Sequence, residues 1–425
     1  MMKSFCRTKR DLHMVTKEIN EFLDNPTATH FDLSGMRALT HTHLIELNGC
    51  TKLVSINLSH TGIKDVSNLK HCPNLSQITI SNCGDLTDVS GLGQCESLHT
   101  LDLSWCDGLT DVSGLEQSAS LHTLNLHGCI SLTNVGGLGK CPSLHTLDLS
   151  RCSEVTDVSG LEQCPSLHTL NLSRCRELTN VSALGLCVSL HTVYITHADS
   201  LRDVSALGQC QSLHTLHMVE CEKIKDVSAL ERCQSLYTLI LKWCEGVTNV
   251  SDLGKCPSLH TLELSFCSGV TNVSALGQCA SLAILTLNWC DGITNVSDLG
   301  KCPSLHTFNV IYCSKVTYVS GLAQCASLHT LRLAGCRRVT DVSSLWQCPS
   351  LHLLSLNGSY NVSDISTLGQ CTSLHVLGLY GCDKITDVSG LGQSASLHVL
   401  NLRGCDTVRD VSGLSQCASL HTLAI

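Results

Sequence analysis

Cysteine and histidine recur along this chain at a spacing that could bind a metal ion. The 425 residues include 29 cysteines and 22 histidines, and segment after segment reads Cys-x3-His, as at Cys141 and His145. A second series of cysteines follows eleven residues after the first, as at Cys152. Thiolates and imidazoles are preferred zinc ligands, and cysteines alone could form disulfides. Whether these residues can bind a metal or form disulfides depends on the secondary-structure elements that position them.

Those elements are the coils of one repeat. The motif CxSLHTL, with Ser in place of Cys at two starts, returns every 23 residues from Cys72 to Cys417 without an insertion. Such regularity is typical of a solenoid in which each repeat packs on its neighbours. Within LxxLxL, alternation predicts one short strand per coil, with Leu147 and Leu149 facing inward and Asp148 facing outward.

The rest of each coil returns the chain to the start of the next one. In one coil, Val155, Val158 and Leu161 form its apolar floor, and the TDVSG segment holds residues that make turns and caps. About 12 residues are too few for a long helix, so we expect extended or single-turn 3₁₀ structure. The prediction is an α/β-type repeat solenoid, a horseshoe with a concave parallel β-sheet and a mostly non-helical convex side.

The 23-residue repeat argues against a metal or disulfide role for the cysteines and histidines. Ser118, Ser394, Ala198 and Ser359 replace single cysteines without a paired loss, which a disulfide or a metal cluster would not easily tolerate. We therefore predict buried thiols that donate weak hydrogen bonds to carbonyls, with no metal and no cofactor. The histidines are predicted to stack as a ladder along the sheet: His99, His122, His145, His168, His191, His214, His260, His306, His329, His352, His375, His398 and His421.

The LxxLxL pattern, the cysteine after the strand and the DVSxL return resemble the leucine-rich-repeat superfamily over roughly residues 50–425. The cysteine resembles the cysteine-containing class found in F-box-associated proteins, and the short return resembles the SDS22-like class. LTDVSGLGQC beside SLHTLDLSWC is similar to kinetoplastid leucine-rich-repeat proteins described as adenylate-cyclase regulators. These resemblances imply a protein-binding scaffold, regulatory to a signalling enzyme or, alternatively, a substrate-recognition subunit of a ubiquitin ligase.

The two ends of the chain differ from the repeat. Apolar residues at helical spacing predict an amphipathic helix over residues 8–24, and residues 1–27 are assigned as its N-terminal cap. The solenoid is assigned to residues 28–425, with a degenerate first strand around Phe31 and Leu33. No C-terminal cap is recognisable after the last strand. An open parallel edge would allow self-association.

Composition excludes several classes of protein. The net charge of −9 and the absence of a basic stripe argue against a nucleic-acid partner. No signal-peptide core and no run of 18 apolar residues occurs, so we predict a cytoplasmic protein without membrane insertion, rather than an extracellular receptor or adhesion ectodomain. No phosphate loop, zinc-protease motif or isolated nucleophile appears, which predicts that the protein is not an enzyme.

Binding is expected where exposed positions depart from the repeat consensus. The residue before the second cysteine is aromatic in four successive coils, over roughly 15 Å at the strand spacing. Exposed aromatic clusters are typical of protein-binding hot spots. The predicted protein-binding residues are Trp243, Phe266, Trp289, Tyr312, Lys242, Ile240, Glu263, Tyr194, His217, Glu220, Arg151 and Arg174. The partner would be one or more proteins.

Overall fold

The computed structural model describes residues 2–425, and it describes side chains from Leu12 onward. The chain divides into two compact units, residues 1–213 (unit 1) and residues 214–425 (unit 2). Both units consist of coils that each contribute one short strand and, in nearly every coil, one 3₁₀ helix. Among the described helices, none is both long and apolar enough to cross a membrane.

Unit 1 begins with helix α1 (Met2–Asp24), which extends further toward the N-terminus than the predicted residues 8–24. Val15, Ile19 and Phe22 of this helix are buried, and the Phe22 ring stacks on Phe31 with 4.4 Å between ring centroids. The ammonium of Lys52 donates hydrogen bonds to the carbonyls of Phe22, Leu23 and Asn25. The helix is therefore attached to the first coils by both apolar and polar contacts.

The strands of unit 1 are β1 (His30–Asp32), β2 (Ser55–Asn57), β3 (Gln77–Thr79), β4 (Thr100–Asp102), β5 (Thr123–Asn125), β6 (Thr146–Asp148), β7 (Thr169–Asn171) and β8 (Thr192–Thr196). Its remaining helices are α2 (His41–Leu44), η1 (Ile45–Leu47), η2 (Ser67–His71), η3 (Ser90–Gln94), η4 (Ser113–Gln117), η5 (Gly136–Lys140), η6 (Leu161–Gln163), η7 (Ser182–Leu186) and η8 (Ser205–Gln209).

The strands of unit 2 are β9 (Thr215–Val219), β10 (Thr238–Lys242), β11 (Thr261–Glu263), β12 (Ile284–Thr286), β13 (Thr307–Asn309), β14 (Thr330–Arg332), β15 (Leu353–Ser355), β16 (Val376–Gly378), β17 (Val399–Asn401) and β18 (Thr422–Ala424). Its 3₁₀ helices are η9 (Ser228–Arg232), η10 (Ser251–Lys255), η11 (Ser274–Gln278), η12 (Ser297–Lys301), η13 (Ser320–Gln324), η14 (Ser343–Gln347), η15 (Ser366–Gln370), η16 (Ser389–Gln393) and η17 (Ser412–Gln416).

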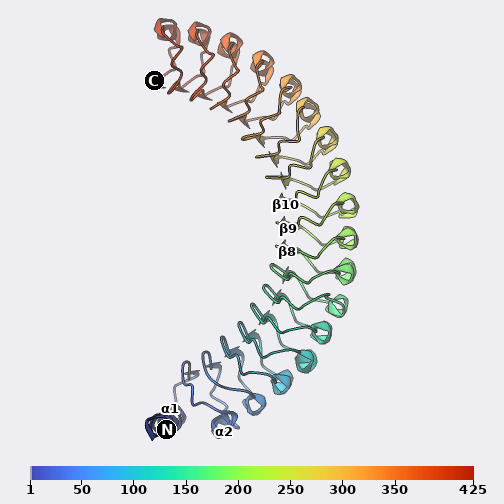
Figure 1. The fold of residues 1–425 in the computed structure, drawn as a ribbon, viewed down its shortest axis with the longest axis vertical. Helices are drawn as coiled ribbons and strands as arrows, with labels where there is room; N and C mark the ends of the chain where they lie inside the picture. The colour runs from blue at the N-terminus through green and yellow to red at the C-terminus, as the bar shows by residue number, and fades with distance from the viewer. Residues whose placement is uncertain (1) are drawn as a thin grey trace. The chain divides into compact units, whose positions relative to one another are not determined.

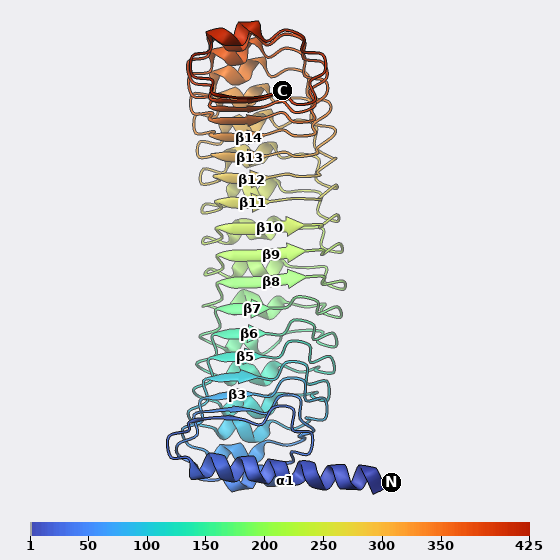
Figure 2. The same ribbon diagram turned by 90° about the vertical axis from the view of Figure 1, so that its left-hand side faces the viewer.

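Within each unit the strands pair in parallel and in a register of one coil. Thr123 of β5 lies opposite Thr146 of β6, and Leu285 of β12 lies opposite Phe308 of β13. In either unit the strands lie on one side of the coils and the 3₁₀ helices lie on the other (Figure 1), and the strands stack as a ladder of parallel arrows (Figure 2). This arrangement confirms the predicted repeat solenoid and its single-turn 3₁₀ return.

In most coils the turn before the 3₁₀ helix is closed by the Asp or Asn of the repeated DVS segment. In the coil that contains η4, the carboxylate of Asp111 accepts hydrogen bonds from the backbone N–H of Ser113, at 2.9 Å, and from its hydroxyl, at 2.6 Å. The Asn version of the segment forms the same backbone bond, as between Asn180 and Ser182. These side chains satisfy backbone donors that a short helix leaves without an internal partner.

The second cysteine series forms a hydrogen-bonded ladder inside the coils. The Cys152 thiol donates to the Leu126 carbonyl of the preceding coil at 3.2 Å, and where serine replaces cysteine the Ser359 hydroxyl donates to Leu333 at 2.8 Å. Burial raises the pKa of Cys129 to about 12, so this thiol stays protonated and remains a donor at neutral pH. The prediction of buried thiols that donate to carbonyls is confirmed.

The histidine ladder is stacked in most of the predicted pairs, whereas the rings of His398 and His421 meet edge to face at 73°. In unit 1 the ring centroids of His122 and His145 are 4.7 Å apart, and those of His145 and His168 are 4.6 Å apart, with nearly parallel planes. In unit 2 Tyr237 replaces one imidazole and stacks between His214 and His260. Over the described part of the chain, no group of three or more His, Cys, Asp or Glu side chains is placed to hold a metal ion.

Three strands are longer than the others. Strands β8, β9 and β10 have five residues each, whereas the other strands have three. In typical coils an Asp or Asn ends the strand, as when Asp148 accepts a hydrogen bond from the N–H of Ser150. Tyr194, His217 and Ile240 stand at that position in the three longer strands. Thr286 and Gly378 stand there in β12 and β16, which keep three residues, so the loss of Asp or Asn is not sufficient to lengthen a strand.

Candidate functional site

The residue before the second cysteine of each coil has an unusual backbone conformation. We call this series the edge row. Its non-glycine members from Trp105 onward have φ between 49° and 64°: Trp105, Arg151, Arg174, His197, Glu220, Trp243, Phe266, Trp289 and Tyr312. Other coils carry glycine there, as at Gly128 and Gly335. A side chain in the left-handed region costs about 1–2 kcal/mol relative to glycine.

Hydrogen bonds between coils hold the edge row in this conformation. In unit 2 the backbone N–H of Trp243 donates to the Ser265 carbonyl at 3.0 Å, and that of Tyr312 donates to the Ala334 carbonyl at 2.7 Å. Backbone hydrogen bonds between neighbouring coils therefore fix this turn, whichever side chain the residue carries. The left-handed conformation is not among the sequence predictions, although the alternation of glycine and large residues in one column is a signal for it.

The structure brings the four predicted aromatic residues of unit 2 together as a continuous stack. Ring centroids are 3.7 Å apart for Trp243 and Phe266, 5.8 Å for Phe266 and Trp289, and 4.5 Å for Trp289 and Tyr312. Interplanar angles are 6°, 8° and 29° in the same order. We call these four residues the aromatic stack. Trp243, Trp289 and Tyr312 remain 43–47% exposed, so large apolar faces meet solvent.

The aromatic stack ends on a glycine of the next coil. A Cβ atom at Gly335 would lie 2.5 Å from Cδ1 of Tyr312, because the tyrosine ring covers this position. In unit 1, Gly128 has the same relation to the ring of Trp105. Glycine at these two places thus permits both the positive φ and the close approach of the ring.

Five further predicted residues of unit 2 border the stack, four of them on the strands and one in the edge row. Ile240 is half-buried on β10, and the ammonium of Lys242 forms an ion pair with the Glu263 carboxylate at 3.0 Å. Partial burial and the positive charge of Lys242 lower the pKa of His217. Glu220, in the edge row, is exposed and donates its backbone N–H to the Lys242 carbonyl. Polar and charged groups therefore border the aromatic stack.

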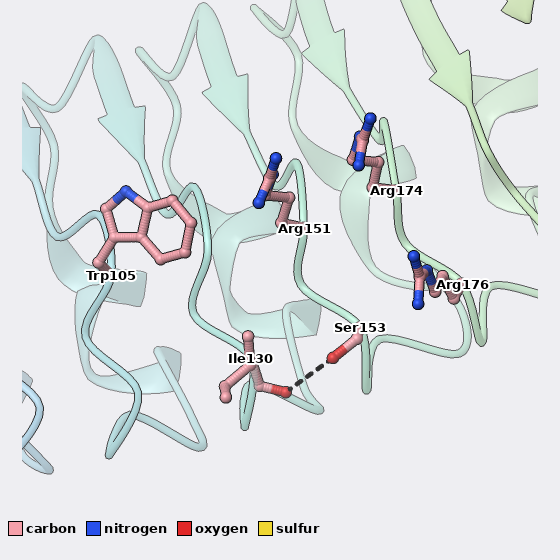
Figure 3. Close-up of a pocket in the computed structure, with 6 residues that line it drawn as sticks. All are labelled: Trp105, Ile130, Arg151, Ser153, Arg174 and Arg176. Atoms are coloured by element: carbon pink, nitrogen blue, oxygen red, sulfur yellow. Dashed lines mark hydrogen bonds between the residues drawn. The ribbon is translucent and has the colours of Figure 1, made fainter.

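The other predicted residues belong to unit 1. Tyr194 is half-buried on β8. Arg151 and Arg174 are exposed and, with Trp105, line one side of a shallow pocket. Figure 3 shows its opposite side, which is formed by Ile130, Ser153 and Arg176 from the column two residues further along each coil. These last three residues are not among the predicted site residues, although the same repeat alignment places them in one column.

Comparison with known proteins agrees with this architecture. The family model described as Leucine Rich repeats (2 copies) matches residues 119–163 and 142–186, and the model described as Leucine Rich repeat matches residues 94–115. The matches cover part of residues 94–186, and each unit has the coil, strand and return of the leucine-rich-repeat fold. The predicted resemblance to the leucine-rich-repeat superfamily is thereby confirmed. No curated protein sequence matches the chain.

Two solved structures show the same fold. A leucine-rich-repeat protein of Leptospira interrogans is 18% identical, covers 96% of this chain and 98% of its own, and superposes with a TM-score of 0.65. The functional domain of InlJ from Listeria monocytogenes, described as including a cysteine ladder, is 18% identical. That match covers 91% of this chain and 78% of the domain, with a TM-score of 0.50.

Proposed function

We propose that this protein is a non-enzymatic protein-protein interaction scaffold and that the aromatic stack of unit 2 is its principal contact surface. The observation that carries the proposal is the placement of exposed aromatic rings at left-handed positions. Glycine occupies the same row in several other coils, where it carries no such backbone cost. Stacking between the rings recovers part of the backbone cost of the positive φ. Stacking alone does not require the outward surfaces of the rings to be exposed to solvent.

The surroundings of the aromatic stack support a protein partner. Tryptophan and tyrosine are enriched among the residues that dominate protein-protein binding energy, and polar groups commonly border such centres. The Lys242–Glu263 ion pair and exposed Glu220 supply this border. Leucine-rich-repeat proteins generally bind proteins, and the regulatory and ubiquitin-ligase roles implied by the sequence resemblances stay predictions.

The test is a pair of glycine substitutions in the aromatic stack. Trp243→Gly with Trp289→Gly should leave the fold intact, because glycine suits the positive φ of both positions. Partner affinity should fall by roughly a hundredfold or more, since hot-spot residues contribute at least about 2 kcal/mol each. Quantitative affinity capture from source cells, followed by titration of the recovered partner, measures this effect.

A matched control removes an exposed aromatic ring elsewhere in unit 2. Tyr318 is 62% exposed and lies in the return segment, where its backbone bridges to Asn295. Tyr318→Ala should therefore keep the wild-type partner affinity. Undiminished capture by the folded double glycine variant would contradict the proposed surface.

We also propose a cytoplasmic location, supported by the state of the thiols. None of the 28 cysteines with described side chains forms a disulfide, and burial raises the pKa of many of them, as for Cys95 to about 12. Protein isolated from its native compartment with thiols trapped at lysis should react slowly with a thiol reagent while folded, and should titrate nearly completely after unfolding. A large deficit of thiols in the unfolded protein would instead indicate an oxidising compartment.

A further inference from the structure

The shallow pocket of unit 1 concentrates positive charge in a chain of net charge −9. Three of its six lining residues are Arg151, Arg174 and Arg176, and Trp105 and Ile130 provide apolar surface beside them. Figure 3 shows the side chains arriving from successive coils, with two arginines in the edge row and one in the neighbouring column. The pocket volume is about 230 Å³, which is sufficient for a small anionic group and part of the chain that carries it.

Most of this positive charge is uncompensated. Arg176 lies 3.7 Å from the carboxylate of Asp199, and this is the single ion pair of the three arginines within residues 2–425. Arg151 lies over the ring of Trp105, 5.5 Å from its centroid, and Arg174 contacts the ring of His197 at 3.4 Å. The carboxylates adjacent in sequence, Glu154 and Glu177, are exposed and take no part in these ion pairs.

The two edge-row arginines are costly in the absence of a ligand. Their φ values are 63° and 64°, at positions where glycine would be unstrained. They also repeat at an interval of one coil, so like charges follow one another along the row. Trp105 orients one guanidinium by stacking, which reduces its hydration on one face. The backbone strain, the neighbouring positive charges and the oriented guanidinium group together favour a site that binds an anion.

We propose that this pocket binds the phosphate of a phosphorylated serine or threonine in a protein partner. Two guanidinium groups without a carboxylate partner match the charge of about −1.5 to −2 and the three acceptor oxygens of such a phosphate better than the single charge of a carboxylate. Trp105 and Ile130 would contact an apolar residue next to the phosphorylated one. This inference extends the proposed protein-binding function to a second surface with its own chemistry.

The test uses the full chain and synthetic tripeptides in isothermal titration calorimetry. The probe is acetyl-Leu-phosphoThr-Leu-amide, compared with the Thr and Glu versions of the same peptide and with inorganic phosphate. The phosphopeptide should bind at least about tenfold more tightly than the Glu peptide and inorganic phosphate, and the Thr peptide should not bind measurably. Equal affinity for the Glu peptide, equal affinity for inorganic phosphate, or no binding of the phosphopeptide would each overturn the proposal.

Substitutions locate the site and separate it from the aromatic stack. Arg151→Gly with Arg174→Gly should weaken phosphopeptide binding by about a hundredfold, with an unchanged or higher Tm because glycine relieves the backbone strain. Asp199→Asn should tighten binding, since it releases Arg176, and Arg338→Ala in unit 2 should leave binding unchanged. Trp243→Gly with Trp289→Gly should also leave it unchanged, so failure of this site and failure of the aromatic surface are distinguishable. Wild-type phosphopeptide affinity in the folded double arginine variant would overturn the assignment.

Discussion

Acidification from about pH 7.5 to about pH 5.5 should lower the free energy of unfolding, because the stacked histidines must then accept protons one coil apart. Partial burial first, and neighbouring imidazoles second, hold the pKa of His122, His145, His329 and His352 below its ordinary value. The structural cause is the same in both units. Rings stacked at 4.7–4.8 Å in these pairs cannot all carry charge without mutual repulsion.

The sign of the effect follows from the direction of these pKa shifts. An unfolded chain titrates its histidines near pH 6.5, whereas the folded pKa values are lower. Between those values the unfolded state binds more protons, so the free energy of unfolding rises with pH. The contribution is fully present above about pH 6.5 and is lost as the pH falls through the folded pKa values. We expect a decrease in Tm of several degrees, because the shifts of several ladder positions add.

Urea unfolding at the two pH values measures this effect, and the chain itself suggests the control. Tyr237 stacks between His214 and His260 with ring centroids 4.9 and 4.5 Å away, so an aromatic ring without a titratable imidazole fits the ladder. His329→Tyr with His352→Tyr should therefore reduce the pH dependence while retaining the stack. Identical unfolding free energies for the wild type at both pH values would contradict the prediction.

Phe308→Ala should destabilise unit 2 by about 3–5 kcal/mol, the usual cost of removing a buried phenylalanine from a core. Phe308 is completely buried on β13, and its register neighbours are Leu285 on β12 and Leu331 on β14. Thin coils offer few side chains that could move into the resulting cavity. The loss should be largest in the coils around β13, since a solenoid is stabilised by contacts between neighbouring repeats.

Phe308→Leu is the matched control, because leucine occupies the same position in both neighbouring coils. This exchange should cost less than about 1.5 kcal/mol. Chemical denaturation gives the energies, and hydrogen exchange should show lost protection near Trp289 and Tyr312 in the alanine variant alone. Equal stabilities for the two variants would show that the cavity contributes little.

Much of the fold could be predicted because each residue of a solenoid has its counterparts one period away as neighbours. Aligning the chain to 23 residues therefore identifies both the local structure and the contacts between coils. The stacking of His122 on His145 and the hydrogen bond from Cys152 to the preceding coil follow from that alignment. The aromatic stack is predictable for the same reason, since Trp243 and Phe266 occupy one column.

The conformation of the edge row and the pocket of unit 1 depend on three-dimensional geometry that periodicity does not contain. The left-handed φ of Arg151 arises from a turn fixed by its backbone hydrogen bond to Ser173 in the next coil. The grouping of Arg176 with Trp105 arises from long side chains that cross between columns and between coils. Sequence by itself therefore determined the repeat, its ladders and the aromatic column. Tertiary structure decided which exposed side chains are strained and which converge, because these properties depend on backbone torsion and side-chain direction.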